Sequence, residues 1–244
     1  MRLDSLLHQM GYFQSRQKAK EAILEHKVRY EGAVLTKPSL ELEPLSLNPA
    51  RLEIASHLIS RAGYKLQDFL AHLPALTKSL KPLHIAGSVV LDIGSSTGGF
   101  AQVLLESSAK HIVCVDVGSN QLHPSLRQDP RITLFENCDI RDFDTTTRFG
   151  LITCDVSFIS LRLVLPSILR FDAPNLILLF KPQFEVGKAA KRNKKGVLQE
   201  PHIARQSLEE FCALLAPTHA YITHKSNILG KEGNAEYFIL AQRK

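Results

Sequence analysis

The chain has 244 residues, 44% of them hydrophobic and 22% charged, which predicts a globular protein with one sizeable core and a small accessory domain. The formal net charge of +6 suits a polyanionic partner without requiring one. The cysteines are widely spaced, so neither disulfide bonds nor a metal site is expected. We find no secretory signal and no apolar run near the ~20 residues of a spanning helix, which predicts a cytoplasmic protein without membrane insertion.

Residues 1–58 are expected to form a small α+β domain with its linker. Apolar residues at helical spacing within the first ten positions predict one helix, and Ser15 can cap a second helix with its own apolar face. Apolar residues between Val28 and Leu35, around Gly32, predict two short strands joined by a turn. The proline-containing stretch 38–49 is expected to be an extended connection or an edge strand.

Residues 59–244 alternate between apolar runs of strand length and segments of helix length. This pattern is typical of an α/β fold in which a mostly parallel sheet is covered on both faces. Seven strands are expected, at Val89–Ile93, Ile112–Val115, Ile132–Phe135, Leu151–Cys154, Leu176–Phe180, Ala220–Thr223 and Tyr237–Leu240. Helices are expected at Arg61–Leu73, Phe100–Leu105, Leu161–Leu169 and His202–Leu215.

The segment LDIGSSTGGF, residues 91–100, carries a strand into a helix through a turn of small residues. Glycines let a backbone approach a ligand closely and the first N–H groups of a helix are unpaired, so we expect a ligand site here. The turn reads G-x-x-x-G-G, which matches neither the phosphate loop nor the dinucleotide fingerprint. Asp116 ends the next strand, where a carboxylate can accept hydrogen bonds from a ribose diol, and Asp139 follows the third strand, where it can reach an adenine amino group. The alternative for each acid is a helix cap or a solvated loop.

This turn, with an acid after each of the next two strands, resembles the S-adenosylmethionine-dependent methyltransferases of Rossmann type. The resemblance implies a Rossmann-like methyltransferase domain over residues 59–244 and S-adenosyl-L-methionine as the cofactor. The residues that it implies for cofactor binding are Asp92, Gly94, Ser95, Ser96, Gly98, Gly99, Phe100, Asp116, Val117, Asp139, Ile140 and Asp155.

Four further ionisable residues, Lys65, Asp155, Lys181 and Glu236, stand at strand ends or at the start of a helix. Because the carboxyl ends of parallel strands open on one rim of a sheet, Asp155 and Lys181 should project beside the cofactor. The alternatives are an exposed helix residue for Lys65 and a charge at the sheet edge for Glu236. In this order the four residues resemble the catalytic tetrad of FtsJ-type ribose 2′-O-methyltransferases. Our hypothesis is that Lys181 is the base or hydrogen-bonds the attacking oxygen, while Asp155 and Glu236 orient the two lysines.

Three short motifs, DVSFISL at 155–161, KPQFE at 181–185 and Gly196-Val197, resemble the TlyA family. That resemblance implies methylation of ribose 2′-hydroxyls in ribosomal RNA, with ribosomal RNA or ribosomal subunits as the partner and no obligate protein partner evident. Two other functions remain open. One is a membrane-active cytolysin, because the family has also carried a haemolysin label, and the other is a ribosome-assembly factor that binds RNA without catalysis.

The N-terminal segment resembles the small RNA-binding domain that some pseudouridine synthases share with a small-subunit ribosomal protein. The similarity includes Arg2-Leu3-Asp4, the pair Ser15-Arg16 and Lys37-Pro38-Ser39. The family usually has glycine where this chain has His26, so we expect His26 to make the turn after the second helix. The residues expected to contact RNA are Arg2, Arg16, Lys18, Lys20 and, at the start of the catalytic domain, Arg61.

Overall fold

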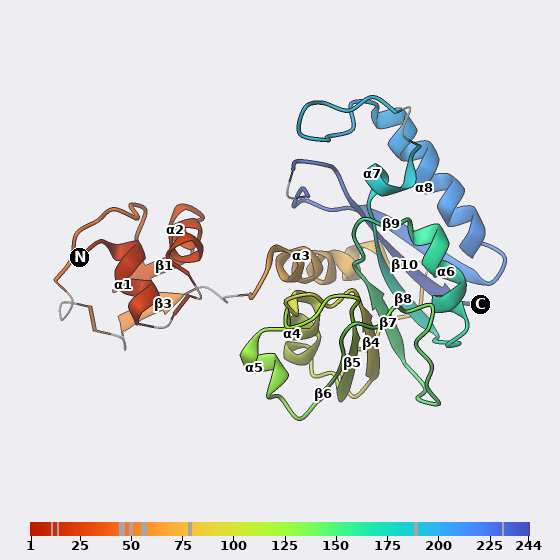
Figure 1. Cartoon of the computed structure of the whole chain (residues 1–244), viewed down its shortest axis with the longest axis horizontal. Helices are drawn as coiled ribbons and strands as arrows, with labels where there is room; N and C mark the ends of the chain where they lie inside the picture. Colours follow the sequence, from red (N-terminus) through yellow and green to blue (C-terminus); the bar gives the residue numbers. More distant parts are fainter. Residues whose placement is uncertain are drawn as a thin grey trace. The chain divides into compact units, whose positions relative to one another are not determined.

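The computed structural model describes residues 1–10, 12–13, 15–43, 47–48, 51–54, 58–77, 80–187, 190–230 and 232–244 (Figure 1). The chain divides into two compact units, Met1–His57 and Leu58–Lys244. Each unit has a hydrophobic core of its own. Part of the stretch expected to be a connection or an edge strand, at 44–46 and 49, lies outside the described residues.

The smaller unit packs two helices against a small antiparallel sheet. Within its described residues the elements are α1 (Leu3–Gln9), α2 (Arg16–Leu24), β1 (Val28–Tyr30), β2 (Ala33–Val34) and β3 (Leu52–Ile54). The strand order is β2-β1-β3, with antiparallel pairing on both sides of β1. The Ser15 hydroxyl accepts a hydrogen bond from the Lys18 N–H, so the predicted cap of the second helix is present. Strand β3 was not predicted.

Helix α2 ends in the turn that was expected at His26. His26 has a φ of 60°, in the left-handed region. The N–H of His26 donates to the carbonyl of Ile23, and the N–H of Lys27 donates to the carbonyl of Ala22. These two bonds form a Schellman motif, which usually has glycine where this chain has His26. The prediction from the sequence is therefore confirmed.

The larger unit is built on one open sheet. Its strands within the described residues are β4 (Val89–Ile93), β5 (His111–Val115), β6 (Ile132–Phe135), β7 (Leu151–Cys154), β8 (Asn175–Phe180), β9 (His219–Lys225) and β10 (Tyr237–Arg243). They follow the order β6-β5-β4-β7-β8-β10-β9. β10 runs antiparallel to β8 and β9, whereas the other neighbouring strands are parallel. The predicted seven-stranded, mostly parallel sheet is confirmed.

Helices cover both faces of this sheet (Figure 1). The helices of this unit are α3 (Arg61–Leu76), α4 (Gly99–Glu106), α5 (Pro124–Arg127), α6 (Leu161–Leu169), α7 (Pro182–Glu185) and α8 (Pro201–Leu215). Apolar residues of α3 and α4 form a core on one face of the sheet, and those of α6 and α8 form a core on the other. The α/β class is therefore confirmed, and the short helices α5 and α7 are additions to the prediction.

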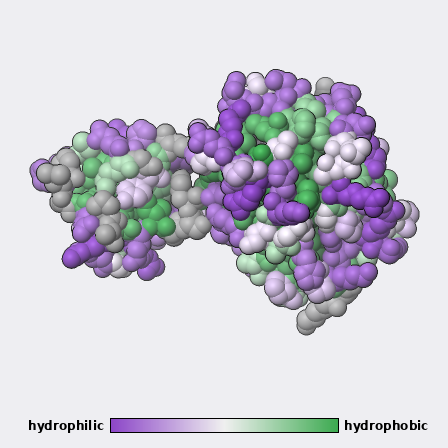
Figure 2. Space-filling model, turned by 90° about the horizontal axis from the view of Figure 1, so that it is seen from below, coloured by the Kyte–Doolittle hydropathy of each residue, from purple (hydrophilic) through white to green (hydrophobic). Residues whose placement is uncertain are grey.

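Hydrophilic residues cover much of the face shown in Figure 2, with hydrophobic residues visible between them. Among the described residues, no helix is both long enough and apolar enough to cross a membrane.

Candidate functional site

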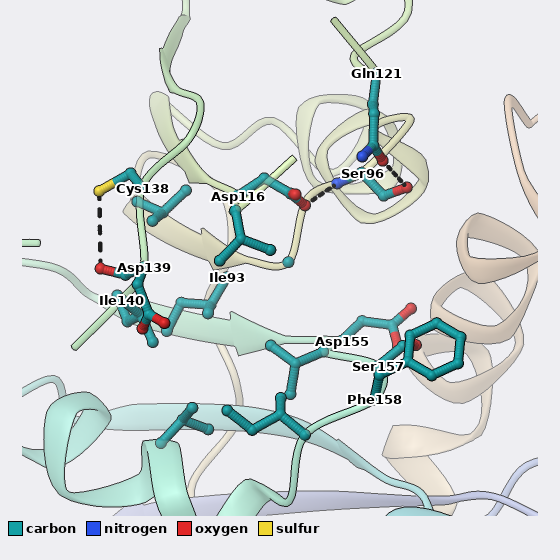
Figure 3. Close-up of a pocket in the computed structure, with 16 residues that line it drawn as sticks. Ile93, Ser96, Asp116, Gln121, Cys138, Asp139, Ile140, Asp155, Ser157 and Phe158 are labelled. Carbon is teal, nitrogen blue, oxygen red and sulfur yellow. Dashed lines mark hydrogen bonds between the residues drawn. The ribbon is translucent and has the colours of Figure 1, made fainter. Parts of the chain in front are cut away.

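A cavity of about 360 Å³ opens where β4, β5 and β7 end, and Figure 3 shows the side chains around it. Seven of the expected cofactor residues line it: Gly94, Ser96, Asp116, Val117, Asp139, Ile140 and Asp155. Gln121, Cys138 and the segment from Val156 to Ile159 complete much of the wall. The carboxyl ends of neighbouring parallel strands therefore share one cavity, as ligand sites in open α/β sheets do.

Gly94 joins the turn after β4 to the end of β7. Its φ is +76°, and a Cβ built on it would lie 2.9 Å from the carbonyl oxygen of Asp155. A backbone atom cannot rotate away as a side chain can, so this position requires glycine on two grounds. Further along the turn, the Ser96 N–H donates to Asp116 Oδ2 at 2.8 Å, and its hydroxyl bonds to Gln121 Oε1 at 3.0 Å. The turn, β5 and the loop after β5 therefore support one another.

The two acids that were expected to recognise the cofactor already have partners within the chain. Asp116 accepts the N–H groups of Ser96 and Gly118, one on each oxygen. Each carboxylate oxygen has a second lone pair, so a diol can still bind there. Asp139 forms a two-point ion pair with Arg141, the shorter contact being 2.6 Å. The hydrogen bonds from Arg141 lower the pKa of Asp139, and a ligand amino group would have to share this carboxylate.

The remaining expected cofactor residues, Asp92, Ser95, Gly98, Gly99 and Phe100, lie outside the cavity lining that the described residues form. Phe100 is buried in the core between α4 and the sheet. A Cβ on Gly98 would lie 2.2 Å from Leu126, and one on Gly99 would lie 2.0 Å from the Ser60 hydroxyl. Close packing thus favours glycine at both positions, whereas the sequence argument considered only the approach of a ligand to the backbone.

Asp92 lies buried beneath the turn. Thr153 donates to its Oδ1 at 2.6 Å, and its Oδ2 has no hydrogen-bond partner among the described residues. Burial raises the pKa of Asp92 to about 7, and the nearby carboxylates of Asp155 and Asp116 also raise it. Asp92 therefore supports the turn from below and does not line the cavity.

Two buried ion pairs stand at the rim beside the cavity. Lys65 Nζ lies 2.6 Å from Glu236 Oε2, and Lys181 Nζ lies 2.6 Å from Asp155 Oδ1. All four side chains are at most 13% exposed. Burial raises the pKa of Asp155, opposed first by the charge of Lys181 and then by Lys65, so the pairs interact electrostatically. The structure therefore brings the four predicted catalytic residues together.

The antiparallel direction of β10 explains how Glu236 reaches this rim. The rim holds the ends of the parallel strands, so an antiparallel strand must begin there, and Glu236 directly precedes β10. The loop before Glu236 also packs closely, since a Cβ on Gly230 would lie 2.6 Å from Glu236 Oε1. Sequence reasoning could place Glu236 before a strand, but the strand's direction sets its position.

Ser157 and Phe158 are additions to the predicted site. Lys181 Nζ donates to the Ser157 hydroxyl at 2.7 Å, so the serine is a second anchor for that ammonium group. Phe158 is 92% exposed at the edge of the cavity and has a φ of 64°. A bulky residue in the left-handed region carries strain of about 1–3 kcal/mol, and such outliers cluster at functional sites. Both residues lie in the DVSFISL motif, which was the signal that could have identified them.

The expected RNA-contacting residues fall into separate groups. Arg2, Arg16 and Lys20 line one hollow of the smaller unit around the buried Asp4. Asp4 forms ion pairs with Arg2 at 2.9 Å and with Arg16 at 3.2 Å, so part of this positive charge is neutralised within the unit. Lys18, on the same helix, does not line that hollow as the described residues define it. In the larger unit, Arg61 begins α3 and donates to the carbonyl of Leu229 at 2.9 Å.

Comparison with known proteins gives matches over both units. Residues 58–243 match the FtsJ-like methyltransferase family, and residues 1–44 match the S4 domain. The 23S rRNA (cytidine-2′-O)-methyltransferase TlyA of Campylobacter jejuni is 44% identical over 92% of this chain and 92% of its own length. The 16S/23S rRNA (cytidine-2′-O)-methyltransferase TlyA of Mycobacterium tuberculosis is 34% identical over 98% of this chain and 88% of its own length. A solved structure described as a putative hemolysin from Streptococcus thermophilus has a TM-score of 0.69 and 30% identity, covering 100% of this chain and 88% of that one.

Proposed function

This chain belongs to the TlyA family of FtsJ-like methyltransferases, and from that premise we propose that it transfers a methyl group from S-adenosyl-L-methionine to a ribose 2′-hydroxyl of ribosomal RNA. The observation that carries the proposal is the pair of buried Lys–carboxylate contacts at the edge of the cavity. Burying two ammonium groups costs free energy. The stability of the fold alone therefore does not explain why these pairs are present. Their placement beside a ligand cavity favours chemistry on a hydroxyl group.

The residues that line the cavity suit the chemistry of S-adenosylmethionine. Its wall combines the close-packed glycine turn at Gly94, a carboxylate at Asp116 with lone pairs to spare, and apolar contacts from Val117 and Ile140. An adenosine has matching groups: a ribose diol, a flat apolar base and an exocyclic amine. We assign the diol to Asp116 and the base to the wall that includes Ile140 and Asp139.

The reaction needs little from the protein beyond alignment and a route for one proton. When bound, S-adenosylmethionine supplies a methyl group on a positively charged sulfur that departs as a neutral thioether. Asp155 and Ser157 fix Lys181 Nζ on two sides, so this nitrogen has a defined position beside the cavity. We assign to Lys181 the proton that leaves the hydroxyl as the oxygen–carbon bond forms, which requires Lys181 first to release the proton of its resting ion pair to solvent. Asp155 then stabilises the resulting ammonium, and alignment of this kind contributes roughly 7–11 kcal/mol to lowering such barriers.

Lys65 and Glu236 form the second half of the site. Their 2.6 Å contact holds a positive charge close to Asp155, and Lys65 opposes the burial-driven rise of the Asp155 pKa. Asp155 can therefore remain ionised next to Lys181. Glu236 in turn keeps Lys65 in place, so we regard the second pair as positioning the first.

Phe158 and the smaller unit supply the means to hold RNA. An exposed aromatic ring beside a ribose-methylating site can stack on the target base once that base has left its helix, as aromatic side chains do in single-stranded RNA recognition. The S4 domain gives a second RNA contact, through the hollow formed by Arg2, Arg16 and Lys20. A ribosomal RNA substrate supports our proposal that the protein works in the cytoplasm.

The proposal is tested with labelled S-adenosylmethionine and unmodified ribosomal subunits. We expect one or more ribose methyl groups, located by nuclease digestion and mass spectrometry. Lys181→Met should bind the donor normally, measured by calorimetry, and lower the methylation rate by at least about 100-fold, because proton transfer by a side chain contributes about 10²–10⁴-fold. Lys110→Met, at an exposed lysine outside the cavity, is the matched control and should be as active as the unaltered protein. A methyl group on a base, or full activity of Lys181→Met, would contradict the proposal.

A further inference from the structure

A second cluster of ligating side chains lies between α3 and β9. Asp68 and His72 are one helical turn apart on α3, and His224 comes from β9. One potential ligand atom from each of the three lies within 4.8 Å of those of the other two. None of these residues lines the donor cavity that the described residues form. We propose that Asp68, His72 and His224 bind a divalent transition-metal ion of the zinc type, separately from the methyl-transfer site.

The hydrogen bonds of His72 leave it ready to act as a ligand. Its Nδ1 lies 2.7 Å from the carbonyl oxygen of Asp68. A carbonyl oxygen can only accept, so Nδ1 carries the hydrogen and the lone pair of the neutral ring is on Nε2. Histidines that bind metals usually donate their other ring N–H to a carbonyl or a carboxylate in this way, which fixes the orientation of the ring.

His224 offers the second imidazole nitrogen. Its Nε2 is buried and has no hydrogen-bond partner among the residues that the structure describes. A buried, unpaired ring nitrogen costs free energy unless it acquires a ligand. The His224 and His72 rings stack with centroids 5.3 Å apart, so the two imidazoles are direct neighbours.

Asp68 completes a set of two imidazoles and one carboxylate. Its Oδ2 accepts a hydrogen bond from the Asn227 amide at 3.0 Å, and its Oδ1 lies 3.6 Å from His72 Nδ1. Zinc binds such ligands at about 2.0–2.2 Å, which places neighbouring ligand atoms roughly 3.4 Å apart. Because the three ligand atoms lie up to 4.8 Å apart, they must approach one another by up to about 1.4 Å, and the partly exposed Asp68 and His72 can rotate to do so. Water would complete the coordination, because the side chains of His72 and Asp68 are partly exposed.

The metal would join two elements that frame the methyl-transfer site. Helix α3 also carries Lys65, and His224 of β9 is paired with Phe238 of β10, the strand that Glu236 precedes. Phe69 of α3 stacks on Phe238 with ring centroids 4.4 Å apart, so the cluster sits at the edge of an existing packing contact. Binding there should raise the thermal stability of the larger unit, because a ligand that binds only the folded state stabilises it.

The test uses the full chain without an affinity tag, dialysed against zinc chloride and measured by elemental analysis and by thermal unfolding. We expect one zinc ion per chain, a raised unfolding temperature and reversal of both by a chelator. His72→Ala changes an exposed side chain and should lower zinc affinity by at least about tenfold, because even the loss of an outer partner of a metal ligand costs about 10–100-fold. Asp68→Asn should act in the same direction.

His202→Ala, which removes an exposed histidine on α8, is the matched control and should bind zinc as the unaltered chain does. Cobalt in place of zinc gives a second readout, since nitrogen and oxygen ligands produce a visible absorption band without the charge-transfer band of a thiolate. The proposal is overturned if the unaltered chain binds no zinc, if His72→Ala binds it equally well, or if the cobalt spectrum shows cysteine ligation.

Discussion

Gly94 shows how one residue couples the turn after β4 to the end of β7 in the candidate site. Its missing side chain lets the turn after β4 approach the backbone of Asp155, and its φ of +76° excludes most other residues. We predict that Gly94→Ala destabilises the larger unit by about 2 kcal/mol or more and weakens donor binding. Calorimetry and thermal unfolding would measure both effects. Gly187→Ala is the control, because a Cβ there meets nothing within 4 Å, and equal behaviour of the two variants would refute the coupling.

Phe158 is the residue at which a substitution should most clearly change activity without changing stability. It is 92% exposed and has a positive φ, so its side chain adds little to folding, apart from a ring contact with Phe184 at 5.4 Å. We predict that Phe158→Ala leaves the unfolding temperature unchanged and lowers rRNA methylation about 10–100-fold, which corresponds to a stacking loss of about 1–3 kcal/mol. Phe158→Tyr keeps the ring and should retain the rate. Full methylation by the alanine variant would exclude the stacking role.

At the scale of elements, Asp4 joins α1 to α2. Its buried carboxylate pairs with Arg2, next to α1, and with Arg16, the first residue of α2. The hydrogen bond from Arg2, together with Arg16, lowers the Asp4 pKa to about 2 from its ordinary value of 3.8. A carboxyl group whose pKa is lower in the folded state adds stability above its unfolded pKa, and that stability is lost as pH falls toward the folded pKa.

The smaller unit should therefore lose stability between about pH 4 and pH 2, and Asp4→Asn should remove that dependence while being less stable at neutral pH. Chemical unfolding at a series of pH values, followed by a probe in the smaller unit, measures this. Identical pH profiles for the two proteins would show that the ion pairs contribute nothing.

The elements that could be predicted from sequence are those with a strong periodic signal. The runs at 89–93, 132–135 and 151–154 become strands with the predicted bounds, because short, mostly apolar runs rich in β-branched residues are typical of strands. Helices α5 and α7 have only four residues each, too few to show a helical period. Strand β3 has three residues with a glutamate at its centre, so it has no apolar run to detect.

The sequence analysis named seven residues of the cavity lining and the members of both buried ion pairs, whereas it could not predict the contacts between them. Lys65 and Glu236 are 171 positions apart, and only the sheet order brings them to 2.6 Å. The ion pair between Asp139 and Arg141 depends on the geometry of the loop, which the sequence pattern does not reveal. The cluster of Asp68, His72 and His224 was missed for a related reason. The cysteine spacing gave no sign of a metal site. The second histidine, His224, comes from a strand far along the chain, so no sequence spacing connects it with Asp68 and His72.

At the scale of the whole molecule, the two units have separate cores and separate family matches. We predict that residues 58–244 alone fold and bind S-adenosylmethionine with the affinity of the full chain. Their methylation of ribosomal subunits should fall by at least about tenfold, and the salt dependence of binding should become shallower, because fewer phosphates are contacted. Binding assays at several salt concentrations would measure this. Unchanged methylation would mean that the smaller unit does not hold the substrate.

The position of β10 has a consequence for the order in which the protein is made. β10 is the last strand of the sheet in sequence, yet it lies between β8 and β9 and follows directly on Glu236. A growing chain emerges from its first residue onward, so β9 has no neighbour to pair with until β10 has been synthesised. The Lys65–Glu236 contact must form late for the same reason. The centre that contains the two lysine–carboxylate pairs is thus incomplete until the last strand of the sheet has been synthesised.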